Sequence, residues 1–200
     1  SWIAPVFHVR CASCTMTARA ARSTWREAPL SAMSTHPQAP DLLVRSPWGT
    51  LAAWHSEAGL ARLDYDWRGP APAALFACSG RAAVLRDALN SYFAGEPVTF
   101  DAVTLDLSAG TPFQQEVWRA ICAIPWGDTW TYGAVARRVG KPGAARAIGQ
   151  AMGANPIPIV VPCHRVIGVS GIGGYTGGLE WKRRLLSLEG ASIPGKGMPC

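Results

Sequence analysis

A closely spaced group of three prolines in the second half of the chain restricts the fold more than any other feature of the sequence. Pro156, Pro158 and Pro162 each fix the backbone φ angle and lack an N–H group, so no helix can pass through them. Residues 159–161 between them are apolar and β-branched. We therefore predict a stiff, extended and apolar segment that leads up to Cys163.

A thiol and an imidazole stand next to each other at the end of this segment, in Cys163 and His164. A thiolate is a nucleophile, and a nearby base with hydrogen-bond donors lowers the pKa of a thiol. Neighbouring side chains on a straight strand point to opposite faces, so these two groups can act together only if the chain turns. An isolated pair of this kind favours the alternative, a buried structural cysteine beside a surface histidine.

Three helices are predicted between residue 111 and the proline segment. The first begins at Thr111, a good N-cap followed by Pro112, with Gln114 placed to complete a capping box. The second is predicted at 131–139 and the third at 143–152, with a short glycine-containing turn between them. Two short helices joined in this way are typical of a helix-turn-helix motif.

The third of these helices carries mostly small residues and one charged side chain, Arg146. Glycine costs about 1 kcal/mol relative to alanine inside a helix, so repeated small residues indicate that something comes close. Either a DNA groove approaches and Arg146 reaches into it, or the helix packs tightly against its own protein; the helix alone favours the second. The small residues are Gly143, Ala144, Ala145, Ala147, Gly149, Ala151 and Gly153.

Residues 41–108 predict a small α+β unit in which nothing looks catalytic. Short runs with strand character alternate with tight turns, and one helical run has an apolar face. The predicted elements are strands at 42–45, 50–55 and 59–66, a helix at 81–93 with Ala82, Leu85, Leu89 and Phe93 on one face, an extended piece at 98–107 and a linker at 108–110.

Charge is distributed unevenly along the chain, whose formal net charge is +6. Residues 41–128 hold six Lys or Arg against ten Asp or Glu, whereas residues 129–200 hold nine against two. A basic second half fits a surface that meets phosphates, with Arg137, Arg138 and Lys141 as candidate contacts. A basic face that is merely solvated gives the same pattern.

Residues 1–40 differ from the rest and are assigned no function. They hold four Arg and one acidic residue, show no hydrophobic period and predict a disordered extension. A transit peptide, an upstream stretch before a start at Met33 and a fragment are the open alternatives. His8, Cys11 and Cys14 are too few ligands for a structural zinc site, so we expect neither a metal nor a cofactor.

The six cysteines are irregularly spaced, which indicates a reducing compartment rather than a disulfide framework. Cys78 and Cys122 lie in apolar sequence and are expected to be buried. No apolar stretch approaches the roughly 20 residues that span a bilayer. We therefore expect a soluble protein that does not bind membranes.

The run from Pro162 to Val166, preceded by Asn155-Pro156-x-Pro158, resembles the signature of the methylated-DNA–protein-cysteine methyltransferases, also called O6-alkylguanine-DNA alkyltransferases. The resemblance extends from about residue 110 to 190, and several motifs in the same order argue against chance. The other matching motifs are Thr131-Tyr132-Gly133, Ala144-Ala145-Arg146-Ala147, Tyr175-Thr176-Gly177-Gly178 and Leu188-Glu189-Gly190.

The resemblance implies an α+β fold in two domains. A small ribonuclease-H-like domain at 41–108 would precede a mostly helical domain at 109–192, which contains a helix-turn-helix (winged-helix-like) motif, binds DNA and holds the active site. Residues 193–200 would be a tail. The partner would be double-stranded DNA containing O6-alkylguanine, bound by a monomer in the bacterial cytoplasm, or in the nucleus of a eukaryote.

The implied function is DNA repair by irreversible, stoichiometric transfer of an alkyl group from guanine O6 to Cys163. His164 would act through a water as the base and Glu189 would orient it, while Asn155 would tie the third helix to the cysteine loop. The base would be flipped out through the minor groove, with Tyr132 rotating the nucleotide and Arg146 filling the gap.

The remaining implied roles concern the pocket and the DNA surface. The carbonyls of Cys163 and Val166 would read the exocyclic amine, and the Thr176 amide would face O6. Apart from the resemblance, we expect Arg165 to anchor the loop structurally rather than to take part in the chemistry. The implied pocket residues are Tyr132, Cys163, Val166, Tyr175, Thr176, Gly177 and Gly178; the implied DNA contacts are Tyr132, Arg137, Ala144, Ala145, Arg146 and Gly149.

Other functions remain as alternatives. A non-catalytic module that only binds damaged bases would lack the acceptor cysteine, whereas Cys163 is present. A regulatory repair protein with a metal-bound N-terminal region is supported only by Cys11 and Cys14. A papain-type hydrolase is disfavoured because its Cys and His are far apart in sequence. The size of the accepted alkyl group and activity on O4-alkylthymine are left open.

Overall fold

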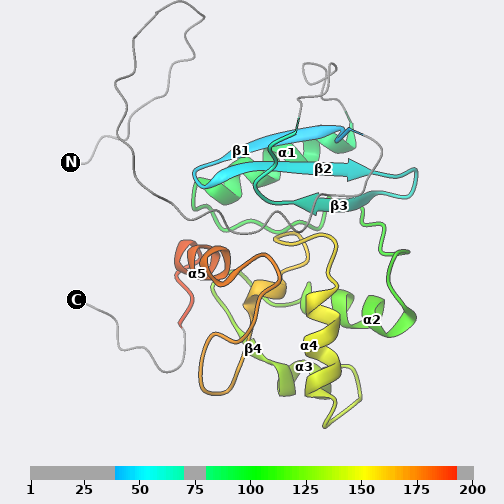
Figure 1. Cartoon of the computed structure of the whole chain (residues 1–200), viewed down its shortest axis with the longest axis vertical. Coiled ribbons are helices and arrows are strands. Elements are labelled where there is room, and N and C mark those ends of the chain that lie inside the picture. Colours follow the sequence, from blue (N-terminus) through cyan, green and yellow to red (C-terminus); the bar gives the residue numbers. More distant parts are fainter. Residues whose placement is uncertain (1–38, 70–79, 193–200) are drawn as a thin grey trace, which may run out of the picture. The chain divides into compact units, whose positions relative to one another are not determined.

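The computed structural model describes residues 39–69 and 80–192. A three-stranded antiparallel sheet and one helix come first, and a mainly helical second half follows (Figure 1). This arrangement confirms the predicted α+β fold. Most of residues 1–40, Cys78 and the tail at 193–200 lie outside the described residues. The elements are β1 Leu42–Ser46, β2 Gly49–His55, β3 Leu60–Asp64, α1 Arg81–Phe93, α2 Pro112–Ile121, β4 Trp130–Thr131, α3 Tyr132–Arg138, α4 Ala145–Gly153, the 3-10 turn η1 Cys163–Arg165, β5 Val166–Ile167 and α5 Leu179–Leu188.

The first sheet has the order β1-β2-β3, and both pairs are antiparallel. The β1–β2 register pairs Leu42 with Ala53, so alternate residues of both strands reach the core. Helix α1 contacts β1 and fully buries Leu85, Leu89 and Tyr92. The predicted helix bounds are confirmed. The buried face is completed by Tyr92, whereas the prediction placed Phe93 there.

The predicted extended piece at 98–107 is not a strand. It is irregular, and a hydrogen bond from Val103 N to Phe100 O marks a turn within it. Its only bridge to a strand in the described structure joins Leu105 to Leu60 at the start of β3. The turn interrupts the pairing that a longer strand would need.

The helix starts in the second half follow the predicted caps. Thr111 accepts a hydrogen bond from Gln114 N while the Gln114 side chain accepts one from Thr111 N, so the capping box at α2 is complete. Thr131 caps α3 through Ala134 N. After α3 the chain turns at Gly140, whose φ of 66° suits glycine, and enters α4. The helix-turn-helix pair is therefore present.

The proline segment is not straight as predicted. Ile159 has a φ of 72°, and Val161 N donates to Ile157 O at 2.9 Å, so the segment folds through a tight turn. Proline fixes only its own φ and restricts the residue before it, so the three prolines do not prevent a left-handed φ at Ile159. The chain then winds into η1 at Cys163. The turn that a cooperating Cys163 and His164 require is therefore observed.

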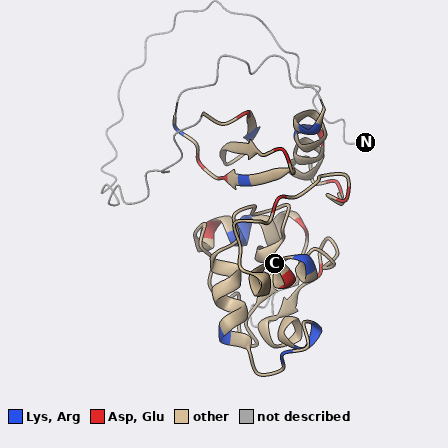
Figure 2. Cartoon of the chain, turned by 90° about the vertical axis from the view of Figure 1, so that its right-hand side faces the viewer, with Lys and Arg blue, Asp and Glu red and all other residues tan. Residues whose placement is uncertain are grey.

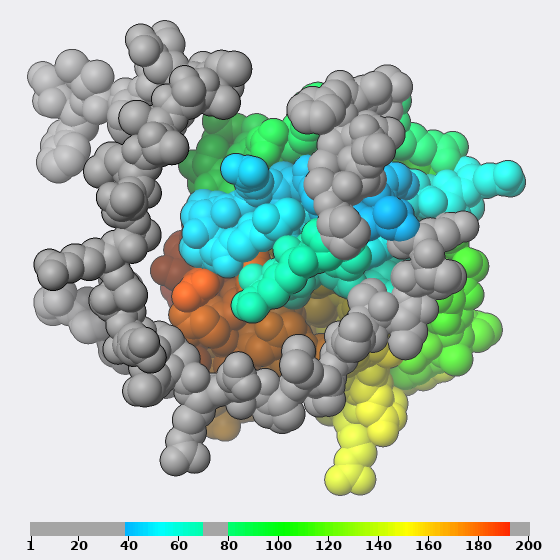
Figure 3. All heavy atoms as spheres, turned by 45° about the horizontal axis from the view of Figure 1, so that its top comes forward, coloured from blue at the N-terminus to red at the C-terminus, as the bar shows by residue number. Residues whose placement is uncertain are grey.

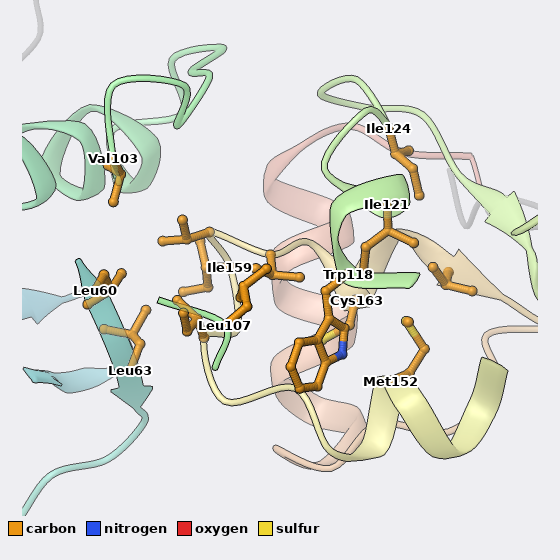
Figure 4. Close-up of a cluster of buried hydrophobic side chains, with 14 of the residues drawn as sticks. Leu60, Leu63, Val103, Leu107, Trp118, Ile121, Ile124, Met152, Ile159 and Cys163 are labelled. Carbon is orange, nitrogen blue, oxygen red and sulfur yellow. The ribbon is translucent and has the colours of Figure 1, made fainter. Parts of the chain in front are cut away.

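One hydrophobic core runs through both halves of the described structure. Leu60 and Leu63 of β3 and Ile159 of the proline segment belong to the same cluster as Trp118 and Cys163 (Figure 4). The indole of Trp118 also donates to Ala151 O of α4 at 2.8 Å, which fixes α4 against α2. The segment that carries the thiol is thus held from both sides. Within the described ranges, no helix is long and apolar enough to cross a membrane.

Candidate active site

Cys163 lies at the start of η1 and is 6% exposed. The side-chain amide of Asn155 donates to its sulfur at 3.0 Å and to Val161 O at 2.9 Å, while Asn155 Oδ1 accepts from Ile157 N. Asn155, which follows α4, is therefore hydrogen-bonded to the cysteine loop at three points. Burial raises the pKa of the Cys163 thiol, and the hydrogen bonds from Asn155 and Tyr175 oppose that rise.

His164 is fully buried and bonded to Glu189. Its Nε2 lies 2.7 Å from Glu189 Oε1, and its Nδ1 is buried without a hydrogen-bond partner in the described structure. Burial lowers the pKa of His164 despite the neighbouring carboxylate, so the ring is neutral at pH 7. Because Nε2 then carries the proton that Glu189 accepts, Nδ1 presents a free lone pair.

The carboxylate of Glu189 is held by more than the histidine. Arg165 donates to it through Nε at 2.9 Å and Nη2 at 3.0 Å, and donates through Nη1 to Ile124 O. Burial alone would raise the pKa of Glu189, but the hydrogen bonds and charges of His164 and Arg165 lower it to about 2. Arg165 thus anchors the loop, as predicted, and keeps Glu189 ionised.

Tyr92 of α1 also belongs to this network, although nothing in residues 41–108 was expected to be catalytic. Its hydroxyl donates to Glu189 Oε1 at 2.5 Å. Burial raises the pKa of Tyr92 well above its usual value, so the hydroxyl keeps its proton. The signal that could have found it is spacing, since Tyr92 lies seven residues after Leu85 and three after Leu89 on the helix.

Lys182 of α5 is a second residue that the sequence analysis missed. It is fully buried, and its Nζ donates to Val166 O at 2.6 Å and Gly174 O at 3.1 Å. Burial lowers its pKa to about 8. The ammonium therefore places positive charge near the thiol and fastens the loop after β5 to α5. In sequence it stands beside Arg183 and Arg184 and resembles a surface residue.

A pocket of about 320 Å³ opens onto the thiol. The predicted pocket residues Tyr132, Cys163, Tyr175 and Thr176 line it, whereas Val166, Gly177 and Gly178 do not. Val166 is buried behind it with its carbonyl bonded to Lys182, and Gly177 lies against Tyr65. The other lining residues, Gly149, Met152, Gly153 and Gly174, come from α4 and the loop before Tyr175.

Helix α4 presents an open and basic outer face beside this pocket. Ala145 and Arg146 are exposed, whereas Ile148, Ala151 and Met152 are buried. A Cβ at Gly149 would meet only Tyr132, at an ordinary 3.9 Å, so packing inside the protein does not require glycine there. This observation favours an external object that approaches α4 closely.

The basic residues of the motif lie at this same end. Residues 132–154 contain Arg137, Arg138, Lys141 and Arg146 and no Asp or Glu, and Figure 2 shows blue without red at the end formed by α3 and α4. Arg137 and Arg146 are exposed. Arg138 lies over the Trp130 ring and Lys141 over the Phe113 ring. The predicted DNA contacts Ala144, Ala145 and Gly149 belong to this surface.

The exposure of Cys122 and the search for a metal site bear on two further expectations from the sequence. Cys122, expected to be buried, is exposed at the end of α2. Partial desolvation of its thiol still raises the pKa to about 11. Its sulfur therefore remains mostly protonated at pH 7. Among the described residues, no group of three or more His, Cys, Asp or Glu side chains is placed to hold a metal ion.

Comparisons with known proteins point to one family. Residues 112–191 match the family described as 6-O-methylguanine DNA methyltransferase, DNA binding domain. The methylated-DNA–protein-cysteine methyltransferase of Mycobacterium tuberculosis is 59% identical over 109 residues, which are 54% of this chain and 65% of that protein. The Salmonella typhimurium protein of the same name is 54% identical over 107 residues, 53% of this chain and 62% of that one. The match thus spans slightly less than two thirds of these relatives.

Solved structures extend the match to the first sheet. The Mycobacterium tuberculosis OGT crystallised in complex with DNA shows a TM-score of 0.64 and 47% identity, covering 74% of this chain and 91% of that one. The second half of the chain is a DNA-binding domain of the kind found in DNA methyltransferases that act on 6-O-methylguanine. The chain belongs to the O6-methylguanine-DNA methyltransferase family.

Proposed function

We propose that this protein repairs O6-alkylguanine in double-stranded DNA by moving the alkyl group onto its own Cys163. The observation that carries the proposal is the site itself. A buried thiol opens into a pocket, and the next residue, His164, is neutral with an unpartnered ring nitrogen and a bond to Glu189. Family membership and the relative crystallised with DNA support the substrate class.

The reaction begins when the Cys163 thiol loses its proton. A water between Cys163 Sγ and His164 Nδ1 takes the thiol proton and passes one to the ring, and Glu189 stabilises the imidazolium that forms. Asn155 donates to the developing thiolate at 3.0 Å in the unreacted state, and the Lys182 ammonium adds favourable charge. The thiol, whose pKa burial raises, is therefore ionised only with these groups in place.

The thiolate then attacks the alkyl carbon on the side opposite O6. A C–S bond forms, and the C–O6 bond breaks with its electron pair going to the base. The base takes back, through water, the proton that His164 holds and remains in the DNA as unmodified guanine. The product is a thioether, which no group in this site can cleave. Each protein molecule therefore acts once.

The lesion reaches the thiol only if the base leaves the stack. Flipping a base costs a few kcal/mol and less when it pairs poorly. The exposed Arg146 on α4 fills the vacated place, and Tyr132, which lines the pocket, crowds the target phosphate. Arg137 binds the backbone, and the small residues of α4 let the helix enter the minor groove.

The pocket then reads the flipped base. The carbonyls of Cys163 and Val166 accept from the exocyclic amine, and since a carbonyl oxygen has two lone pairs, the bond from Lys182 leaves Val166 O able to do so. The Thr176 amide faces O6. Thr176 is fixed for this role by a hydrogen bond from its hydroxyl to Gly153 O at 3.0 Å.

The proposal also covers the domain organisation, the oligomeric state and the place of action. Residues 41–108 and 109–192 are taken as the two domains, acting together as a monomer. The curated relatives named above are bacterial, which supports a place of action in the bacterial cytoplasm.

Intact-mass measurement tests the proposal directly. The protein is mixed with duplex DNA containing one O6-methylguanine, beside the Cys163→Ala variant and beside undamaged DNA. We expect a stoichiometric gain of one methyl group on the Cys163 peptide, absent in both controls. Tight binding to the lesion without a mass change would instead make this a damage-recognition protein.

A further inference from the structure

Tyr65, the residue directly after β3, lies against the segment that covers the pocket. Its ring stacks on Trp181 with centroids 4.2 Å apart and an interplanar angle of 25°. A Cβ on Gly177 would come within 2.7 Å of the same ring. Trp181 is itself held by a hydrogen bond from its Nε1 to Asp66 at 3.0 Å. In Figure 3 the blue-to-teal atoms of β1, β2 and β3 lie beside the orange atoms of the segment around residue 175.

A chain of hydroxyl groups leads from Tyr65 to the nucleophile. The Tyr65 hydroxyl is hydrogen-bonded to the Tyr175 hydroxyl. Tyr175 lines the same pocket as Cys163, and its hydroxyl lowers the pKa of the Cys163 thiol. Burial raises the pKa of both phenols well above the usual value, so both keep their protons at neutral pH. A thiolate can only accept, so Tyr175 must donate to it. The Tyr175 oxygen is then free to accept from Tyr65. Both hydroxyl groups therefore donate in the direction of Cys163.

We propose that Tyr65 is a positioning residue for the nucleophile: its hydroxyl donates to Tyr175 and holds Tyr175 in the orientation that stabilises the thiolate of Cys163. Hydrogen bonds in a chain polarise one another, so Tyr175 is a stronger donor when it also accepts. The sheet of the first half thereby contributes to chemistry in the second half.

The inference rests on the proposed function, because it takes Cys163 as the reacting group. It concerns only the ionisation of the sulfur, however, and that property is measurable without DNA. Iodoacetamide alkylates a thiolate by forming a C–S bond and releasing iodide, so its rate against pH reports the fraction of Cys163 that is ionised. Peptide mapping separates the Cys163 signal from that of exposed Cys122.

The variant is Tyr65→Phe, which removes the hydroxyl and keeps the ring against Trp181 and Gly177. We expect the midpoint of the Cys163 alkylation profile to move up by about half a pH unit, because Tyr175 becomes a weaker and less oriented donor. An unchanged midpoint would overturn the proposal.

Two further variants separate positioning from loosened packing. Asp66→Gly removes the acceptor of the Trp181 indole and suits the positive φ of 52° at that residue; we expect it to leave the midpoint unchanged. A shift as large as that of Tyr65→Phe would mean that packing, not the hydroxyl, matters. In a Tyr175→Phe background, adding Tyr65→Phe should cause no further shift; an additional shift would show that Tyr65 does not act through Tyr175.

The wild-type methyl-transfer measurement, run in parallel, keeps the two proposals distinguishable. If no methyl group is taken from damaged DNA but the midpoint still moves in Tyr65→Phe, the proposed function fails and this inference stands. If methyl transfer occurs and the midpoint does not move in Tyr65→Phe, the proposed function stands and the inference about Tyr65 fails.

Discussion

Glu189→Gln should destabilise the protein strongly, although the substitution changes few atoms. The folded-state pKa of Glu189 is about 2, against 4.5 for the free group. Each pKa unit corresponds to about 1.4 kcal/mol, so the ionised carboxylate contributes about 3 kcal/mol to the free energy of unfolding at pH 7. Because Glu189 is 4% exposed, solvent screening reduces this figure little. A glutamine would also leave the buried guanidinium of Arg165 without a counter-charge.

The pH dependence of this contribution has a definite sign. Since the folded pKa lies below the unfolded one, the stabilisation is fully present above about pH 4.5 and disappears as pH falls towards about 2. Urea unfolding followed by tryptophan fluorescence, repeated across this range, measures it. We expect the wild type to lose about 3 kcal/mol more than Glu189→Gln does between pH 5 and 2.

The matched control is Glu180→Gln on the surface of α5. Glu180 pairs with Arg184 at 2.9 Å, but its side chain is 64% exposed, so its loss should change the free energy of unfolding by less than about 1 kcal/mol. If Glu189→Gln were as mild as this control at pH 7, the description of Glu189 as a buried, charge-assisted hub would be refuted.

Three further outcomes follow from the site. Arg146→Ala should slow methyl transfer from duplex DNA by more than about tenfold, since flipping a base costs a few kcal/mol; its iodoacetamide rate at Cys163 should be unchanged, and an equal loss in both assays would contradict the DNA role. Lys182→Met should move the Cys163 alkylation midpoint to higher pH because a nearby positive charge is lost, and a shift to lower pH would refute that charge effect. Gly177→Ala should lower the free energy of unfolding by about 1–3 kcal/mol in urea titrations, because its Cβ would meet the Tyr65 ring. Gly171→Ala, with nothing within 4 Å of its Cβ, should be close to neutral.

Local chemistry made the helices of the second half predictable. The caps at Thr111 and Thr131 fix where α2 and α3 begin, because each satisfies backbone N–H groups by itself. The pairing of His164 with Glu189 depended on the family resemblance, since the two residues are 25 positions apart in the chain. No local pattern encodes a contact of that kind.

What the sequence did not reveal was set by tertiary contacts. Ile159 adopts a left-handed φ that β-branched residues rarely take, so the surrounding fold must impose it. Lys182 can be buried because the carbonyls of Val166 in β5 and of Gly174 accept from its ammonium. Tyr92 has its hydroxyl partner 97 residues further along the chain. None of these features follows from the residues directly beside it in the sequence.

The hydrogen-bond network at the Glu189 carboxylate also determines when the site is complete during synthesis of the chain. The groups that meet at Glu189 come from α1, η1 and the end of α5, so the site stays incomplete until the ribosome has released residue 189 and the two halves have met. Before that moment His164 lacks the carboxylate that sets its tautomer. Under the proposed function, the acceptor thiol is therefore completed last, after α3 and α4 have been synthesised.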